Sequence, residues 1–164
     1  MEVKGGGVAL SFRNDKRANE TKEKSLNETK SEQVWANVKI GREDILISSS
    51  YRPPGASREV TNNILENIFM VKGLVDKRKY SGMLCMGDFN YEDVKWDNEG
   101  GSCRGKRKKA SLEMLDKIGA NFLIQHVHEP MFGTNTLDLV FSENPNRIFH
   151  VKIGPSFNSS EKNM

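Results

Sequence analysis

The sequence predicts a single α+β domain over residues 1–164, and three observations support this fold class. Strand-like apolar runs number about seven, against roughly two helical segments. No internal repeat or change of composition divides the chain, and 164 residues suffice for one hydrophobic core. Hydrophobic residues form 36% and charged residues 29% of the chain, which is ordinary for a folded protein and excludes a wholly disordered one.

The first predicted elements are a short strand and a polar segment. Residues 7–12, GVALSF, are typical of a strand entered from a glycine run. Residues 13–33 carry many charged and amide side chains, and their hydrophobic residues are only Ala18 and Leu26. Because such a segment buries too little apolar surface to offset its ordering entropy, we expect a long, mobile excursion here.

Two strands and a helix are expected next. Residues 34–40 alternate apolar and polar side chains, as a half-buried strand does. A hairpin turn at 41–44 leads into a strand that ends at Tyr51, because the prolines of RPPG exclude both a helix and a strand ladder. Ser57 is predicted to cap a helix, with Glu59 in its first turn and an apolar stripe behind it.

The second half of the chain predicts the rest of the sheet and another helix. Residues 80–89 form an apolar run that is typical of a buried strand. After a polar loop, regularly spaced apolar residues predict a second helix that ends with Gly119 as its C′ residue. The expected sheet is completed by three strand-like runs: FLIQHV, TLDLVF and RIFHVKIG.

Charge, cysteine content and hydropathy limit the class of protein. The net charge of +3 and the isoelectric point of about 8.8 permit an anionic partner without requiring one. Neither Cys85 nor Cys103 has the spacing of a zinc site, which indicates a reducing compartment without a disulfide framework. No apolar segment is long enough to cross a bilayer, so we expect an intracellular protein that does not bind a membrane.

The most informative polar pair is Asp88 and Asn90, which follows the apolar run in the tetrapeptide GDFN. In an extended backbone these two side chains point to the same face and converge. A carboxylate that orients or deprotonates water, next to an amide that steadies a phosphate oxygen, suits phosphoryl-transfer chemistry. The same pair is also typical of an Asx-type turn that closes a strand.

Three further residues are candidates for the same chemistry. Tyr51 and Arg52 end another predicted strand, where a phenol and a guanidinium can both donate to a phosphate. A tyrosine at such a position also commonly tips its hydroxyl out of the core. Asp138 places a charge inside the apolar run TLDLVF, and we expect it to have a functional or structural partner, because an unpaired buried carboxylate is costly.

A basic run and a histidine pair complete the candidate sites. The run RGKRKK predicts DNA-backbone contacts or nuclear import, with a solvated loop as the alternative. Its basic residues are Arg104, Lys106, Arg107, Lys108 and Lys109. His126 and His128 alternate on one predicted strand with Glu129 beside them, a pattern that suits a metal pair, but no third ligand stands at a suitable spacing.

Five fragments together resemble the endonuclease domain of non-LTR retrotransposons, which belongs to the endonuclease/exonuclease/phosphatase superfamily. In chain order they are GGGVALSF, SSSYRPPG, LCMGDFN, FLIQHVHEP and NTLDLVFS. The resemblance spans nearly the whole chain and implies a four-layer αββα sandwich, here an incomplete one, with its site at the C-terminal ends of central strands. It also implies Mg²⁺-dependent nicking of DNA in the nucleus and a reverse-transcriptase domain in the parent polyprotein.

The resemblance implies a role for each matching residue. Asp88 would orient or activate the attacking water, and Asn90 would hold that water or the phosphate. Tyr51 would contact the scissile phosphate, and Asp138 would position a catalytic histidine near the end of the domain. A Mg²⁺ ion would stabilise charge on the phosphate and the leaving oxygen.

Two departures from the family pattern lead us to expect weak or absent activity. The family carries an Asn and a metal-binding Glu upstream of GGGVAL, where this sequence starts, so both are expected to be missing. The family's terminal Ser-Asp-His corresponds to Ser160, Glu161 and Lys162. Glu161 is a candidate metal ligand, whereas Lys162 suits phosphate binding rather than base catalysis. A DNA-binding remnant without catalysis and a degenerate open reading frame are the alternatives.

Overall fold

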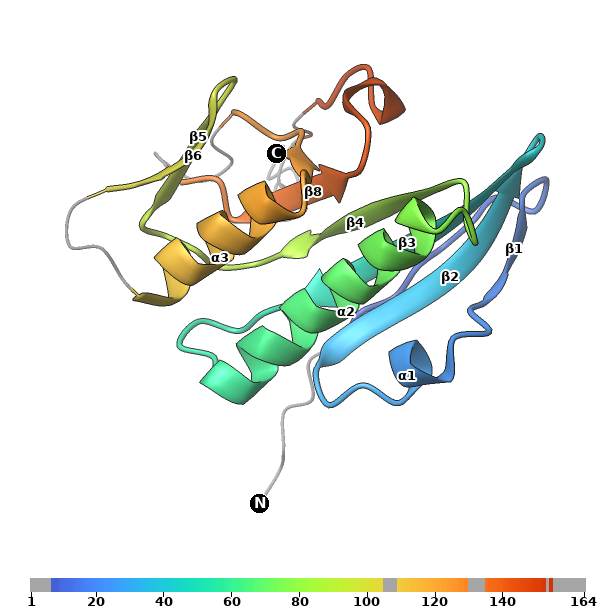
Figure 1. Ribbon diagram of the computed structural model, residues 1–164, viewed down its shortest axis with the longest axis horizontal. Coiled ribbons are helices and arrows are strands. Elements are labelled where there is room, and N and C mark those ends of the chain that lie inside the picture. Colours follow the sequence, from blue (N-terminus) through green and yellow to red (C-terminus); the bar gives the residue numbers. More distant parts are fainter. Residues whose placement is uncertain (1–6, 105–108, 130–134, 153, 155–164) are drawn as a thin grey trace, which may run out of the picture.

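The computed structural model describes residues 7–104, 109–129, 135–152 and 154, and it confirms the α+β class (Figure 1). Its main sheet has the strand order β1-β2-β3-β4-β8-β7, and β5 and β6 form a separate hairpin. The strands are β1 (Arg17–Glu20), β2 (Glu32–Ile40), β3 (Glu43–Tyr51), β4 (Gly82–Asp88), β5 (Val94–Asp97), β6 (Gly100–Cys103), β7 (Ile124–Gln125) and β8 (Asp138–Ser142). The α-helices are α1 (Lys24–Asn27), α2 (Arg58–Asp76) and α3 (Lys109–Ala120), and Pro145–Arg147 form a 3₁₀ turn.

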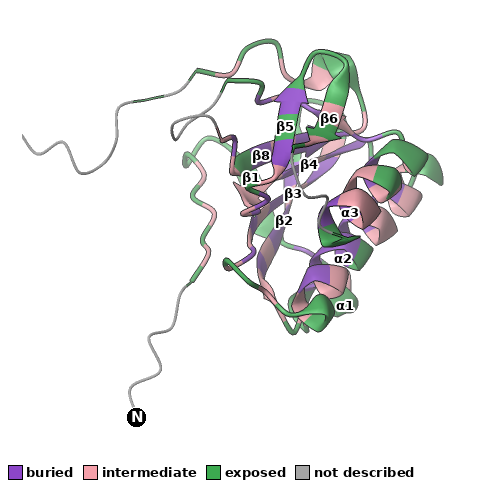
Figure 2. Cartoon of the chain, turned by 90° about the vertical axis from the view of Figure 1, so that its left-hand side faces the viewer, coloured by how far each residue is buried: buried purple, intermediate pink, exposed green. Residues whose placement is uncertain are grey.

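The core lies between the main sheet and the helices, which occupy the same side of it (Figure 2). Ser57 begins α2 as predicted, because its Oγ accepts a hydrogen bond from the Val60 N–H at 3.2 Å. The apolar stripe of α2 packs on β4, and two of its members, Ile68 and Val71, have no exposed surface. No described helix is long and apolar enough to cross a membrane.

The opposite face of the sheet carries half-buried side chains that include Ile47, Met86 and Val140. Residues 7–12 run along this side as an extended segment and do not pair in the sheet, so the predicted strand there is wrong (Figure 2). The alternation that suggested a strand is still present, because Val8, Leu10 and Phe12 are half-buried and the residues between them are exposed. The edge of the sheet beside β2 is instead occupied by β1.

The polar segment 13–33 is ordered, which contradicts the predicted mobile excursion. It contains β1, which pairs antiparallel with β2, and the short helix α1. Leu26 of α1 is only 1% exposed and belongs to the core. Polar contacts hold the rest, since the Tyr80 hydroxyl donates to Glu23 Oε1 at 2.7 Å and Asn27 Nδ2 donates to the Thr21 carbonyl. One buried leucine and edge pairing therefore compensate for a low hydrophobic content.

The later elements differ from the predictions in four places. The polar loop after GDFN contains the hairpin of β5 and β6, which brings Trp96 into the core at 4% exposure. Helix α3 continues through Gly119, and the left-handed residue after it is Phe122, with φ of 53°. FLIQHV pairs only over β7, and RIFHVKIG contributes the end of the 3₁₀ turn and no strand among its described residues.

The ordered state of residues 13–33 can be tested with Leu26→Ala. We expect a loss of about 2–5 kcal/mol in the free energy of unfolding, because a fully buried leucine leaves a cavity. Urea denaturation followed by circular dichroism measures the change. The control is Ile40→Ala, whose side chain is 45% exposed, with an expected loss below about 1 kcal/mol. Equal, small losses of stability in both variants would instead indicate that residues 13–33 are mobile, as the sequence predicts.

Candidate active site

Three of the predicted site residues lie side by side on neighbouring strands. Tyr51 of β3 pairs in register with Asp88 of β4, and Asp88 pairs with Asp138 of β8. Strands β3 and β4 are parallel, so their C-terminal ends meet at one edge, and β8 begins at that edge because it runs antiparallel to β4. Register therefore aligns a phenol and two carboxylates in a single row on the sheet face away from the helices.

Asp88 and Asp138 face each other at close range. The Phe89 N–H donates to the Leu137 carbonyl at 2.9 Å, which makes the two aspartates a non-hydrogen-bonded cross-strand pair. In such pairs the Cα atoms approach to about 4.5 Å and the side chains lie on the same face. Asp138 is largely exposed and its carboxyl group is only partly desolvated, so the fully buried charge predicted from the sequence is not present, and its cross-strand partner is a like charge.

The pKa values of both carboxyl groups are raised. Burial raises the pKa of Asp88, and hydrogen bonds from the side chain and backbone of Asn90 offset part of that effect. Partial burial, followed by the negative charge of Asp88, raises the pKa of Asp138. A carboxylate with a raised pKa holds a proton more strongly and is a better general base.

Asn90 forms the Asx-type turn that was the structural alternative for the GDFN motif. Its backbone N–H donates to Asp88 Oδ1 at 3.2 Å in an Asx-type turn, and its φ of 50° ends the strand. Its Nδ2 donates to the Arg52 carbonyl at 2.9 Å and its side chain also hydrogen-bonds the Asp88 carboxylate. Because both of these partners only accept, the amide nitrogen faces them and Oδ1 is the group available to a ligand.

Gly87 explains why this motif begins with glycine. It lies beside Ser50 on the parallel strand β3, and its φ is +153°. A Cβ atom at position 87 would lie 1.8 Å from the Ser50 carbonyl oxygen, a distance that no side chain tolerates. Glycine therefore allows β4 to approach β3 closely just before Asp88.

The side chain of Arg52 is buried, so it lacks the exposure that the predicted phosphate contact requires. The residue is only 8% exposed, and its Nε donates to Thr61 Oγ1 at 3.0 Å. Its Nη1 donates to the carbonyl oxygens of Phe89 and Asn90, and the guanidinium lies 4.2 Å from the centroid of the Tyr91 ring. A buried guanidinium needs partners for its donors, and the turn after β4 supplies them.

The sequence reading missed Glu32, which extends the row by one strand. Glu32 of β2 pairs in register with Tyr51. Its Oε2 is inaccessible to solvent and has no hydrogen-bond partner within the described part of the chain. An acidic residue at the start of an alternating strand is the only sequence signal, and it does not reveal which residue of β3 it faces.

The basic run is only partly described. Arg104 and Lys109 are exposed at its two ends. The remaining predicted DNA contacts, Lys106, Arg107, Lys108 and Lys162, lie outside the described residues, as does the candidate metal ligand Glu161.

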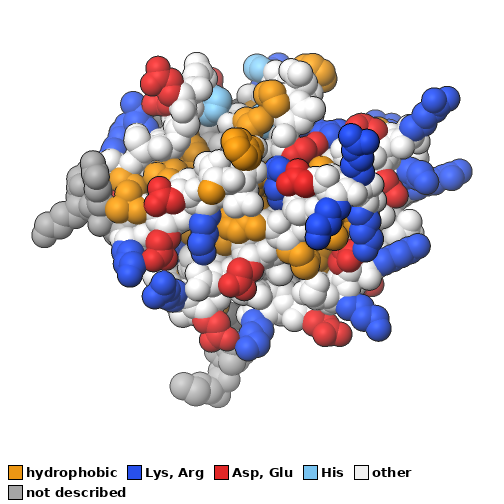
Figure 3. Space-filling model, in the orientation of Figure 1, with side chains coloured by type: hydrophobic (Ala, Val, Ile, Leu, Met, Phe, Trp, Pro, Cys, Tyr) orange, Lys and Arg blue, Asp and Glu red, His pale blue; other side chains and the backbone are white. Residues whose placement is uncertain are grey.

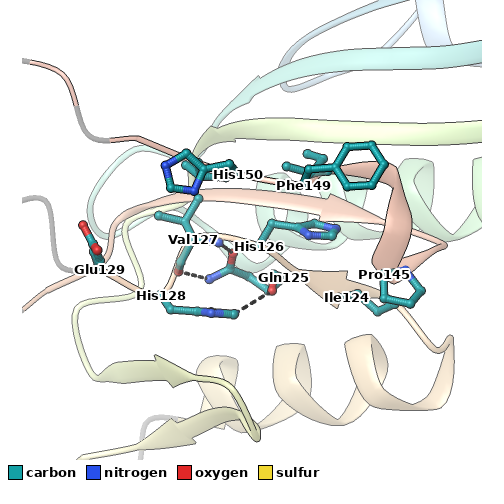
Figure 4. A pocket seen from close by; sticks show the side chains of 11 residues that line it. Ile124, Gln125, His126, Val127, His128, Glu129, Pro145, Phe149 and His150 are labelled. Atoms are coloured by element: carbon teal, nitrogen blue, oxygen red, sulfur yellow. Dashed lines mark hydrogen bonds between the residues drawn. The ribbon is translucent and has the colours of Figure 1, made fainter.

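The histidine pair lines a pocket of about 410 Å³ between residues 124–129 and 145–151 (Figure 4). His126 Nε2 is 2.7 Å from Ser142 Oγ, and His128 Nε2 donates to the Gln125 carbonyl at 2.9 Å. Burial lowers the pKa of His126, with a smaller contribution from His128. No group of three His, Cys, Asp or Glu side chains suited to a metal ion occurs among the described residues. The structure therefore gives the two histidines structural hydrogen bonds.

The fold and the row of polar groups together define an α+β domain with a candidate active site at one edge of its main sheet. A family model described as endonuclease-reverse transcriptase matches residues 45–160. Because this match spans more than half of the sequence, the chain belongs to the endonuclease-reverse transcriptase family. This membership confirms the resemblance inferred from the sequence motifs at the level of the family.

Among solved structures, the chain is similar to the endonuclease domain of TRAS1, a telomere-specific non-LTR retrotransposon. The sequence identity is 14% and the TM-score is 0.47. The alignment covers 79% of this chain and 57% of that chain, so this chain spans a little over half of the compared domain. No curated protein sequence gives a match.

The inward position of Arg52 can be tested with Arg52→Met. We expect a loss of at least about 2–4 kcal/mol in the free energy of unfolding, because the carbonyl groups of Phe89 and Asn90 lose their donor. Urea denaturation measures the loss, and Arg58→Met, at an exposed arginine, is the control with an expected change within about 0.5 kcal/mol. Native stability of Arg52→Met would show that the guanidinium faces solvent.

The facing carboxylates predict that Asp138→Asn stabilises the protein at pH 7. The raised pKa means that the Asp138 carboxyl group binds a proton more strongly in the folded state than in the unfolded state. The contribution of this group to the free energy of unfolding therefore falls as pH rises above about 3.8. Removing the charge should add about 0.2–1 kcal/mol at pH 7, and the gain should shrink toward pH 3.5. Urea denaturation at both pH values gives the result; a variant less stable than the native protein at pH 7 would contradict it.

Proposed function

We propose that this chain is a retroelement-derived endonuclease-like domain whose chemistry is phosphodiester cleavage of DNA, weak or absent in this chain by itself. The observation that carries the proposal is the alignment of Tyr51, Asp88 and Asp138 in one row across three strands. These residue types at one sheet edge can bind a phosphate, activate water and hold a second proton-transfer group.

The roles follow from the groups that each residue offers. Asp88 accepts a proton from the attacking water, and its raised pKa favours that role. Asn90 Oδ1 accepts a hydrogen bond from the same water, because its Nδ2 is already held by the Arg52 carbonyl. The Tyr51 hydroxyl donates a hydrogen bond to a phosphate oxygen. Asp138 holds the group that protonates the leaving oxygen, and the family places a histidine where this sequence has Lys162.

The family expectation of Mg²⁺ fits the described residues only in part. The facing carboxylates of Asp88 and Asp138 are oxygen ligands of the kind that Mg²⁺ prefers. They number two, and the described residues contain no group of three candidate ligands. We therefore derive no step through a metal ion and expect low activity from these residues alone.

A non-catalytic DNA-binding role is the second candidate. It is favoured by the exposed cations at both ends of the basic run, Arg104 and Lys109, because backbone binding needs positive charge and no metal site. Either role places the protein with DNA in the nucleus, beside a reverse-transcriptase domain of the parent polyprotein.

Nicking of supercoiled plasmid tests the catalytic proposal. Any nicking by the native protein in Mg²⁺ should be abolished by EDTA and should fall at least about a hundredfold in Asp88→Asn, because one positioned acid/base group is lost. Asp116→Asn, at an exposed aspartate of α3, is the matched control and should retain the native rate. Nicking that survives Asp88→Asn would exclude the assigned site. No nicking by a sample with native circular dichroism would favour the DNA-binding role.

A further inference from the structure

We propose that the hollow between the first turns of α2 and α3 binds a phosphate of the DNA backbone, with Glu113 occupying the phosphate position in the free protein. The inference rests on the proposed DNA substrate. The hollow has a volume of about 290 Å³, and its charged lining residues are Arg58, Lys109 and Glu113.

The two cations share one carboxylate oxygen. Arg58 Nη2 lies 3.5 Å from Glu113 Oε1, and Lys109 Nζ lies 3.8 Å from the same atom. The side chains of Arg58 and Lys109 are 73% and 81% exposed, so these long ion pairs hold them weakly. The hollow therefore carries an excess of positive charge and two side chains that can turn to another anion at little cost.

The helix dipole does not account for the position of these two cations. Arg58 and Lys109 each stand at the first position of a helix, where positive charge opposes the helix dipole. An arginine fork and a lysine ammonium that converge on one point are, in contrast, a common means of binding a phosphate oxygen. Lys109 does pair with Glu113 within α3, but that contact is long and exposed, so both cations stay available to an external anionic ligand.

The hollow lies at the end of the molecule that carries the row of Tyr51 and Asp88. Helix α2 begins after the short loop that follows β3, and α3 begins at Lys109, the last residue of the basic run. Both helices start toward the left of Figure 1, and Lys and Arg side chains stand at this end in Figure 3. A DNA strand with one phosphate at the row could therefore place other phosphates over the first turns of the helices.

Fluorescence anisotropy with a short labelled DNA duplex in EDTA tests the proposal without any cleavage. The double variant Arg58→Gln/Lys109→Gln should bind about tenfold more weakly at low salt, and the slope of log K against log salt should become shallower by about 0.9, since one phosphate contact is lost. The control, Arg42→Gln/Lys77→Gln, removes the same charge from the hairpin between β2 and β3 and the C-cap of α2, at the other end of the sheet. It should retain most of the native affinity.

Glu113→Gln gives an opposite and more specific expectation. Removing the internal competitor should tighten DNA binding several-fold, whereas a purely structural role of Glu113 would leave binding unchanged or weaken it. Native affinity and slope in the double variant, or equal losses in the double variant and its control, would overturn the proposal. Because binding is measured in EDTA, failure here is separate from failure of the nicking experiment.

Discussion

The buried guanidinium of Arg52 connects three parts of the chain that meet at the candidate site: the end of β3, the turn after β4 and the first turns of α2. The guanidinium donates hydrogen bonds to the backbone carbonyl groups of Phe89 and Asn90 and to the hydroxyl of Thr61. In return, the backbone carbonyl of Arg52 accepts a hydrogen bond from the side-chain amide of Asn90. The orientation of Asn90 and the hydrogen bonds that it gives to Asp88 depend on this reciprocal arrangement. Arg52, which the sequence predicts to contact a phosphate, thus supports the candidate site residues Asn90 and Asp88 from the protein interior.

The row itself works against stability. Two carboxylates face each other across β4 and β8, and Glu32 adds an inaccessible oxygen without a partner among the described residues. Like charges at this distance are tolerated only where the surrounding sheet determines the backbone, which here includes the close approach of Gly87 to β3. Such a costly arrangement is typical of a site that binds a cationic or proton-donating ligand.

Sequence reasoning indicates the residues of the candidate row better than it indicates their surroundings. Asp88 and Tyr51 could be predicted because each ends an apolar run, a signal that is local in the chain. Their alignment with Asp138 could not, since register depends on pairing between strands far apart in sequence. The sequence predicts a phosphate contact for Arg52 because a guanidinium at a strand end can donate to a phosphate, and its burial depends on partners from α2 and from the turn after β4, which are distant in sequence. Leu26 was missed because composition was averaged over a segment in which one side chain provides the anchor.

The central claim is that Asp88 and Asp138 face each other in the folded protein. A ¹³C-carboxyl NMR titration of Asp138 in the native protein and in Asp88→Asn tests it most directly. We expect the pKa of Asp138 to lie above 3.8 in the native protein and to decrease in the variant, because the negative charge of Asp88 contributes to the shift. An ordinary pKa for Asp138 that does not respond to Asp88→Asn would contradict the alignment of β4 with β8 and the site built on it.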